Sequence, residues 1–235
     1  MKNNYIRGYD GLKRLIDCVV AGVGILILSP VFLIVMLVLK IETPDSKVIF
    51  KQERIGRKGN HFFIFKFRSL REDAPRNLPT KKLQEGRFVT KFGYFMRVTG
   101  LDELPQLINI ANGDMSLVGP RPLIPEEGTI HEERMERGVY NLRPGITGLA
   151  QIHGGNSISD YEKLYWDCKY LANRGMLLDL KICVKTILLC IRGRITPQKD
   201  NHTITHNFQK RRKWYLNYCN HDKTAEQTGN TTTFL

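Results

Sequence analysis

The residues with the clearest chemical potential are an acidic pair, Asp102 and Glu103, in the segment RVTGLDELPQLINIANGDMSLVGPRP (residues 97–122). Carboxylates are competent nucleophiles toward phosphorus. Because adjacent helical residues point about 100° apart, the two carboxylates cannot both face one reacting atom. The pair therefore predicts a division of labour, in which one carboxylate attacks phosphorus while the other holds a divalent metal or orients the first.

Basic side chains are expected to complete this site. Two carboxylates beside a diphosphate would repel it unless cations intervene. Mg²⁺ binds carboxylates and phosphate oxygens together, and Mn²⁺ is an alternative ion. Arginine has the fork geometry for bidentate contact with the remaining phosphate charge. The candidates for this contact are Lys66, Arg97, Arg121 and Arg143.

Two proline-containing motifs hold arginines in restricted backbone. In Pro120-Arg121-Pro122 two fixed φ angles leave the guanidinium little entropy to lose, and Arg143-Pro144-Gly145 repeats this arrangement. Taken singly, an acidic pair at a helix start is usually a cap, and Pro-Arg-Pro is usually a loop. Their occurrence together, with a membrane segment in one short basic chain, favours the catalytic interpretation.

The elements that position these residues begin with an uncharged segment. Residues 18–39 read CVVAGVGILILSPVFLIVMLVL, and 22 helical residues reach roughly 33 Å, about the hydrocarbon thickness of a bilayer. Pro30 predicts a kink, because it removes a backbone hydrogen bond, and Ser29 could satisfy the freed group. Basic residues flank both ends. Two topologies stay open: a kinked spanning helix, or a hairpin that dips into one leaflet and returns.

The remaining pattern predicts an α+β fold that is mostly helical. VIFKQERIG and HFFIFKFRS flank a Gly59-Asn60 turn, which indicates a small β-hairpin. Apolar spacing predicts a helix over residues 101–111, opened by the acidic pair, with Pro105 in its first turn. Residues 176–191 carry an apolar stripe that fits either a core or a membrane interface, formed by Leu177, Leu180, Val184, Ile187 and Ile191.

Composition indicates the charge of the partner but does not identify the class of protein. The chain has 235 residues, enough for one domain with accessory segments, and a formal net charge of +13. This charge indicates an anionic partner but does not choose among nucleic acid, lipid headgroups and a phosphorylated substrate. The five cysteines are odd in number and scattered, so neither a disulfide framework nor a zinc site is expected. No recognition-helix, RNP or zinc motif supports nucleic-acid binding.

The chain resembles the bacterial sugar transferases, the monotopic polyprenyl-phosphate phosphoglycosyl transferases that initiate capsule, exopolysaccharide and glycoprotein glycan assembly. Seven motifs match in order over roughly residues 11–192: LKRLID…LSP, VIFKQERIG, FKFRSL, LDELPQLIN, GDMSLVGPRPL, RPGITGLAQI and LLDLKI. Together they are far more specific than any one of them alone. The chain is similar to the short form of the family.

The resemblance implies transfer of a sugar-1-phosphate from a UDP-sugar to undecaprenyl phosphate, with Mg²⁺, at the cytoplasmic face of the inner membrane. It implies that Asp102 forms a covalent phosphosugar intermediate, that Glu103 completes the dyad, and that residues 120–122 bind uridine nucleotide. Further positions are carried over by matching: Ser29 and Pro30 to a re-entrant membrane helix, Lys66, Arg97 and Arg143 to phosphate handling, and Asp167 to a substrate-site aspartate after the GLAQI motif.

On this basis residues 1–45 are expected to anchor the protein in membrane lipids, residues 46–200 to form a cytoplasmic catalytic domain, and residues 201–235 to form a basic, partly disordered tail. One departure from the family is Gly155, which stands where a G-R-N motif has arginine. The alternatives are a membrane-tethered scaffold, a nucleic-acid-binding protein and an inactive relative, although the intact dyad argues against the last. The motifs specify neither the sugar nor whether the chain forms a homo-oligomer.

Overall fold

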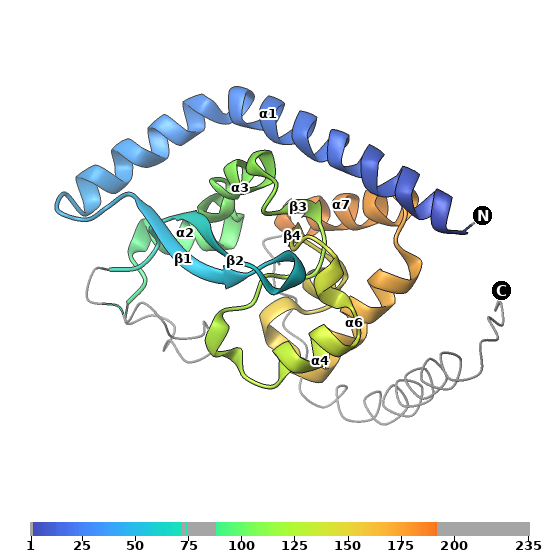
Figure 1. The fold of residues 1–235 in the computed structure, drawn as a ribbon. Coiled ribbons are helices and arrows are strands. Elements are labelled where there is room, and N and C mark those ends of the chain that lie inside the picture. Colours follow the sequence, from blue (N-terminus) through green and yellow to red (C-terminus); the bar gives the residue numbers. More distant parts are fainter. Residues whose placement is uncertain (1, 72–73, 75–87, 192–235) are drawn as a thin grey trace. The chain divides into compact units, whose positions relative to one another are not determined.

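The computed structural model describes residues 2–71, 74 and 88–191. The tail predicted over residues 201–235 lies outside this part of the chain. The fold is α+β and mostly helical, as expected, with two small two-stranded sheets among the described residues. Figure 1 traces the elements in order from helix α1 to helix α7.

Helix α1 (Lys2–Glu42) is a single helix that runs over helix α3 (Gln106–Asn112) and bends along its length (Figure 1). The Ser29 hydroxyl donates to the Leu26 carbonyl at 2.8 Å. Leu26 is four residues before Pro30, so its carbonyl is the one that the missing proline N–H leaves free. The predicted local repair by Ser29 is confirmed. With this repair the helix continues through Pro30, so the change of direction predicted there is a bend within one helix and not a break between two separate helices.

One side of α1 packs on the rest of the described fold, and the other sides are exposed. Ala21, Val35 and Leu39 are buried against residues of α3, the first sheet and helix α2. Large apolar residues along the helix stay exposed, among them Leu26 at 75% and Ile27 at 68%. By length and composition the helix is apolar enough to cross a membrane. A lipid environment accounts for apolar exposure on this scale.

The predicted β-hairpin is confirmed. Strands β1 (Ile49–Ile55) and β2 (His61–Phe67) pair antiparallel, with Phe50 opposite Lys66. The connection is a short 3-10 turn, η1 (Arg57–Gly59), in which Lys58 and Gly59 have φ angles of 60° and 78°. This left-handed turn follows from the Gly-Asn signal in the sequence.

The helix predicted over residues 101–111 begins later than expected. Helix α2 (Lys91–Thr99) ends at Gly100, whose φ of 75° turns the chain left-handed. A 3-10 turn, η2 (Leu101–Glu103), follows, and helix α3 (Gln106–Asn112) begins only after Pro105. Pro105 has no N–H to donate, so it separates the turn from the helix. Asp102 and Glu103 therefore lie on a short turn between two helices.

A second sheet pairs β3 (Ser116–Val118) in parallel with β4 (Gly145–Thr147). The two chain segments approach so closely that only glycine fits between them. A Cβ on Gly145 would lie 2.1 Å from the Gly119 nitrogen, and one on Gly119 would lie 2.4 Å from the Arg143 carbonyl oxygen. This contact fixes where Pro120-Arg121-Pro122 leaves the sheet.

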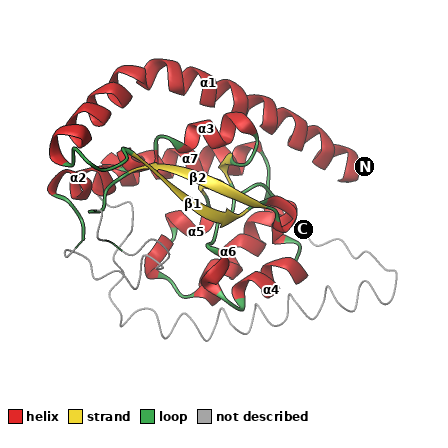
Figure 2. Cartoon of the chain, turned by 60° about the vertical axis from the view of Figure 1, so that its left-hand side comes forward, coloured by secondary structure: helices red, strands yellow, loops and turns green. Residues whose placement is uncertain are grey.

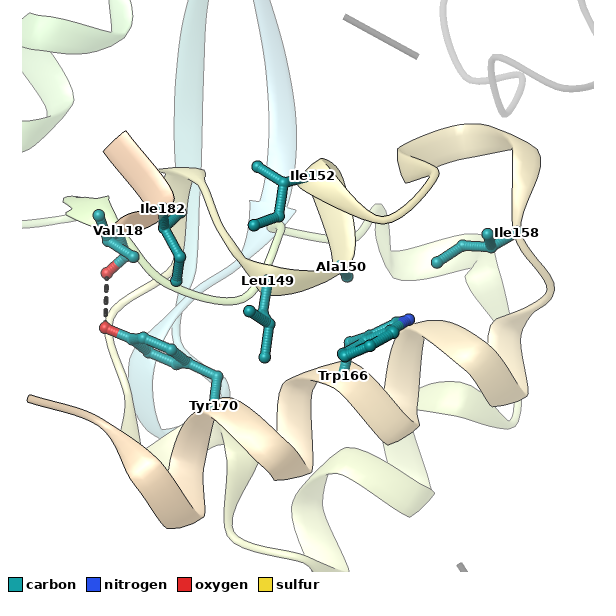
Figure 3. Close-up of a cluster of buried hydrophobic side chains, with 8 residues drawn as sticks. All are labelled: Val118, Leu149, Ala150, Ile152, Ile158, Trp166, Tyr170 and Ile182. Carbon is teal, nitrogen blue, oxygen red and sulfur yellow. Dashed lines mark hydrogen bonds between the residues drawn. The ribbon is translucent and has the colours of Figure 1, made fainter. Parts of the chain in front are cut away.

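The remaining elements complete the described fold, and helix α7 packs on both strands of this sheet. They are η3 (Pro125–Glu127), α4 (Ile130–Glu136), η4 (Val139–Asn141), α5 (Leu149–Ile152), η5 (Gly155–Ser157), α6 (Asp160–Asn173) and α7 (Met176–Ile191). Figure 2 shows α5, α6 and α4 beside the sheets. Helix α6 begins with a capping box between Ser159 and Glu162. Leu149, Trp166 and Ile182 join α5, α6 and α7 in one buried cluster, and the Tyr170 hydroxyl donates to the Val118 carbonyl at 3.3 Å (Figure 3).

Helix α7 exposes the apolar stripe that its sequence predicts. Ile182 packs inward at 1% exposure, whereas Leu177, Leu180, Val184, Ile187 and Ile191 are 49–76% exposed. The stripe therefore does not form part of the core, and of the two sequence interpretations the structure favours the membrane interface.

Candidate active site

The acidic pair meets two of the predicted basic residues. Glu103 accepts a hydrogen bond from the Lys66 ammonium at 2.6 Å, and its Oε1 atom lies 3.6 Å from Nη2 of Arg121. Lys66 comes from β2, Glu103 from η2 and Arg121 from the loop after β3. Three segments that are distant in the sequence thus converge on one carboxylate.

Asp102 is buried without a partner. Its residue exposure is 8%, and among the described residues no hydrogen bond or ion pair reaches its carboxylate. Burial raises the pKa of Asp102 to about 6; the charge of Lys66 opposes this shift, and that of Glu103 adds to it. An acidic side chain of this kind is mostly ionised at neutral pH, yet it lacks the hydrogen bonds that would lower its energy.

Glu103 is in the opposite electrostatic state. Burial alone would raise its pKa, but Lys66 and Arg121 outweigh burial and hold the pKa at about 2. Burial lowers the pKa of Lys66, and the charge of Glu103 opposes that change. The two acidic neighbours therefore differ electrostatically: Glu103 is held as the anion of an ion pair, while the pKa of Asp102 is raised and no described residue forms an ion pair with it.

The Pro120-Arg121-Pro122 loop is held through every one of its carbonyls. The Gly145 N–H donates to Pro120 at 2.9 Å, Arg134 donates to Arg121 at 2.8 Å, and Arg54 donates to Pro122 at 3.1 Å. These bonds add to the fixed proline φ angles, so the Arg121 side chain extends from a preorganised backbone.

Sequence reasoning missed the two arginines that hold this loop. Arg54 is 9% exposed and Arg134 is 1% exposed. Burial, followed by the charge of Arg121, lowers the pKa of Arg54 to about 10, so it remains cationic at neutral pH. Arg54 lies in the quoted motif VIFKQERIG, which was the one available signal. For Arg134 no motif or spacing pointed to a site.

Asp167 lies behind this loop and away from the acidic pair. It is 1% exposed, and its Oδ2 atom accepts a hydrogen bond from Arg134 at 2.5 Å. The same guanidinium binds the Arg121 carbonyl. The structure therefore does not bring Asp167 to the site as a direct ligand; it contacts the site through Arg134.

The other two predicted arginines lie in different surroundings. Arg97, in the last turn of α2, donates to the Ser69 hydroxyl at 2.9 Å, and its charge acts on Asp102. Arg143 donates through Nε to the Gly113 carbonyl at 3.0 Å and lines a pocket beside the first turns of α1. Lys66, Arg97 and Arg121 therefore belong to the neighbourhood of the acidic pair, and Arg143 belongs to another.

A metal at this site would have few protein ligands. Within residues 2–71, 74 and 88–191, no group of three or more His, Cys, Asp or Glu side chains is placed to hold an ion. The Asp102 carboxylate and the second oxygen of Glu103 are the donors that the ion pair leaves over. This small set fits Mg²⁺, which commonly binds one or two carboxylates together with substrate phosphates and water.

Gly155, at the departure from the family pattern, has a φ of 53°, and the preceding Gly154 has a φ of 141°. Glycine adopts such angles without strain, whereas other residues rarely do. The local backbone therefore suits the glycine that this sequence carries.

Comparison with known proteins gives consistent matches. The family model described as bacterial sugar transferase matches residues 8–193. Exopolysaccharide production protein ExoY of Sinorhizobium fredii is 38% identical over 198 residues, which cover 77% of this chain and 87% of ExoY. Uncharacterized sugar transferase EpsL of Bacillus subtilis is 37% identical, with 84% and 95% covered. UDP-glucose:undecaprenyl-phosphate glucose-1-phosphate transferase of Escherichia coli is 36% identical over 75% of this chain but only 39% of its own length.

Proposed function

The chain belongs to the bacterial sugar transferase family, and we propose that it transfers a sugar-1-phosphate from a UDP-sugar to undecaprenyl phosphate, releasing UMP. The observation that carries this proposal is the largely buried carboxylate of Asp102, to which no described residue donates a hydrogen bond, beside the Lys66, Glu103 and Arg121 cluster. A nucleophile next to fixed cations is what displacement at a charged phosphorus requires.

In the first half-reaction, an Asp102 oxygen attacks the phosphorus that carries the sugar. A bond forms between this oxygen and phosphorus, and the phosphoanhydride bond breaks, so that UMP leaves with the bridging oxygen. The product is an aspartyl phosphosugar. The lack of a competing hydrogen bond at Asp102 favours attack, because the lone pairs need not be released from a protein donor.

Lys66 and Arg121 are suited to bind the diphosphate as it approaches. Glu103 holds Lys66 at 2.6 Å, which aims the ammonium and offsets its charge before substrate arrives. The Pro120-Arg121-Pro122 loop presents a guanidinium whose backbone is already fixed, and Arg97 adds positive charge near Asp102. Preorganised cations of this kind stabilise charge that develops in the transition state.

We assign a Mg²⁺ site to Asp102 and the second oxygen of Glu103. When bound there, Mg²⁺ would supply neutralisation of the diphosphate charge and Lewis-acid activation of the leaving group. The two protein carboxylates would account for only part of its coordination, leaving positions for phosphate oxygens and water.

In the second half-reaction, a phosphate oxygen of undecaprenyl phosphate attacks the same phosphorus. The bond to Asp102 breaks, the carboxylate is regenerated, and the product is an undecaprenyl diphosphate sugar. This step requires the site to lie at headgroup depth. The exposed apolar stripe of α7 and the exposed faces of α1 support such a location, since both would enter lipid.

The packing of α1 supports a re-entrant topology. Near its start Tyr9 contacts α6 and α7, and near its end Leu39 packs with Phe67 and Met96 of the same domain. A helix that crossed the bilayer would separate its ends by about 30 Å, on opposite sides of the membrane. We therefore place both ends on the cytoplasmic face of the inner membrane, where nucleotide sugars are available.

The experiment is a screen of the purified full-length chain with Mg²⁺, undecaprenyl phosphate and a panel of UDP-sugars, with UMP as the readout. The expected result is UMP formation with at least one donor, accompanied by a lipid-linked sugar. A panel that yields no UMP would contradict the proposal. Salt-dependent duplex binding by the same preparation would instead favour the nucleic-acid-binding alternative.

A further inference from the structure

A second cationic cluster lies apart from the acidic pair. We call it the basic pocket: it lies beside the first turns of α1 and is also lined by residues of β3, the η1 and η4 turns and the end of α6. Neither Lys66, Asp102, Glu103 nor Arg121 lines it. Its cationic side chains are Lys13, Arg14, Arg57, Arg143 and Arg174.

Three of the five cations lack a carboxylate partner. Lys13 pairs with Asp179 at 2.6 Å, and Arg174 lies 3.4 Å from Asp10. Within the part of the chain that the structure describes, no ion pair neutralises Arg14, Arg57 or Arg143. The other acidic residue of the pocket, Asp17, uses Oδ1 to accept from the Leu117 N–H at 3.1 Å. Even if its charge is counted in full, the pocket retains an excess of positive charge.

The unpaired arginines are held so that they present donors. Arg57 donates through Nε to the Asn141 carbonyl at 2.9 Å, and Arg143 donates through Nε to the Gly113 carbonyl at 3.0 Å. This anchoring fixes each side chain but leaves the terminal amino groups for another acceptor. Arg14 uses both terminal amino groups on the Ile110 and Ala111 carbonyls.

The arginines of the basic pocket repel one another, and this repulsion contributes to a lowered pKa of Arg143. Burial lowers the pKa of Arg143, the charges of Arg57 and Arg14 lower it further, and those of Asp17 and Asp10 oppose the shift only in part. Like charges held this close by backbone contacts gain when an anion joins them. Arginine terminal amino groups match phosphate oxygens in geometry, often through two parallel hydrogen bonds.

We propose that the basic pocket binds a phosphate group through Arg57 and Arg143, as a site separate from the one that performs the transferase chemistry. From α1 the pocket is lined by Tyr9, Asp10, Lys13, Arg14 and Asp17, whereas the exposed Leu12 and Leu15 lie on another side of the helix. The phosphate could belong to a phospholipid headgroup or be free in solution. The shared chemistry is a phosphate oxyanion in a fork of fixed guanidinium groups.

The test measures binding to the detergent-purified full-length chain at constant ionic strength. The ligands are inorganic phosphate and a short-chain phosphatidylglycerol, each titrated while the thermal unfolding midpoint is followed. The test variant is the double substitution Arg57→Gln and Arg143→Gln. The matched control is Arg68→Gln, because Arg68 is half-buried, as Arg143 is, and is anchored through Nε to a backbone carbonyl, that of Lys47, outside the pocket.

The proposal expects the double variant to bind at least about tenfold more weakly, and Arg68→Gln to remain within about twofold of the parent. Binding of both ligands identifies the phosphate group itself as sufficient, and binding of the lipid alone identifies a headgroup that needs its acyl chains. Equal affinity in the double variant and the Arg68→Gln control would overturn the proposal, as would no binding by the parent chain.

Two further variants keep the result interpretable. If the double variant does not fold, Arg143→Lys retains the charge but loses the fork, and it should weaken binding by a smaller factor than loss of charge would. Asp102→Asn should leave binding at the basic pocket unchanged even where UMP formation stops. The phosphate-binding proposal and the transferase proposal can therefore be refuted independently of each other.

Discussion

Two buried aspartates in this fold experience opposite surroundings. Asp167 and Asp102 are 1% and 8% exposed, so both carboxylates are largely removed from water. Asp167 is met by the Arg134 guanidinium at 2.5 Å, while the carboxylate of Asp102 receives no donor from the described residues. Burial raises the pKa of both, but only at Asp167 does a direct ion pair oppose it.

Asp179 follows the pattern of Asp167. It accepts from Tyr9 and Tyr170 at 2.8 Å each and from Lys13 at 2.6 Å, which ties the start of α1 to α6 and α7. Fully partnered carboxylates therefore hold elements together, whereas Asp102, which has no hydrogen bond or ion pair among the described residues, lies where chemistry is expected. A largely buried carboxylate without a hydrogen-bond donor is costly to the fold, which points to a role in function at the expense of stability.

The largest expected effect is on activity, from Asp102→Asn. The amide is no nucleophile toward phosphorus, so UMP release should fall by roughly 10³-fold or more. The free energy of unfolding, in contrast, should rise. A pKa of about 6 against an ordinary 3.8 means that the charged carboxylate costs the fold roughly 3 kcal/mol above pH 6, and the substitution removes this cost. Enzyme assay and denaturant unfolding at pH 7.5 check both; a strongly destabilised variant would contradict the assignment.

Asp167→Asn is the matched change at the partnered site. It leaves the Arg134 charge buried without its carboxylate, so the free energy of unfolding should fall by about 3–5 kcal/mol. Because Arg134 also holds the Arg121 carbonyl, the folded fraction should show a raised KM for the UDP-sugar. A variant as stable as the parent would mean that the two aspartates do not differ as described.

Two substitutions that each remove a neighbouring charge test the pKa of Asp102. The carboxylate form exists above its pKa, so UMP release should decline as the pH falls through about 6. Glu103→Gln removes a charge that raises this pKa and should move the decline to lower pH. Lys66→Gln removes a charge that lowers it and should move the decline to higher pH. Each variant should also lose about 10²-fold in rate, and pH profiles of kcat/KM, measured at subsaturating donor, provide the measurement because they report the free enzyme.

The smallest expected effect concerns a backbone group in α1. Ser29→Ala removes the donor that satisfies the Leu26 carbonyl beside Pro30, and should destabilise the helix by about 0.5–1.5 kcal/mol. The loss should vanish in a Pro30→Ala background, where the backbone N–H supplies the bond. A double-mutant cycle in thermal unfolding measures this coupling, and additive effects would contradict the repair.

Local patterns predicted those parts of the fold that depend on neighbours in sequence. Alternation around Gly59-Asn60 indicated the β1–β2 hairpin, and the Ser29-Pro30 pair indicated a repaired kink. The start of α3 was predicted too early, since spacing of apolar residues does not report the left-handed Gly100 or the break at Pro105. The three-residue strands β3 and β4 are too short to show alternation, so their pairing was not predicted.

The site was predictable as a set of residue types but not as an arrangement. Motifs selected Lys66, Glu103 and Arg121, which the fold brings together. They also selected Arg143, whose position beside α1 depends on the packing of distant segments. Arg134 could not be found because a single buried arginine leaves no periodic signal. Its role follows only from the contacts that it makes.

The most direct measurement is to incubate the full-length chain with a UDP-sugar that supports turnover, without undecaprenyl phosphate, and to map any added mass by peptide mass spectrometry. The account predicts one phosphosugar on the peptide that contains Asp102, formed together with UMP and discharged when the lipid phosphate is added. UMP that forms only in the presence of the lipid, with Asp102 unmodified throughout, would contradict it.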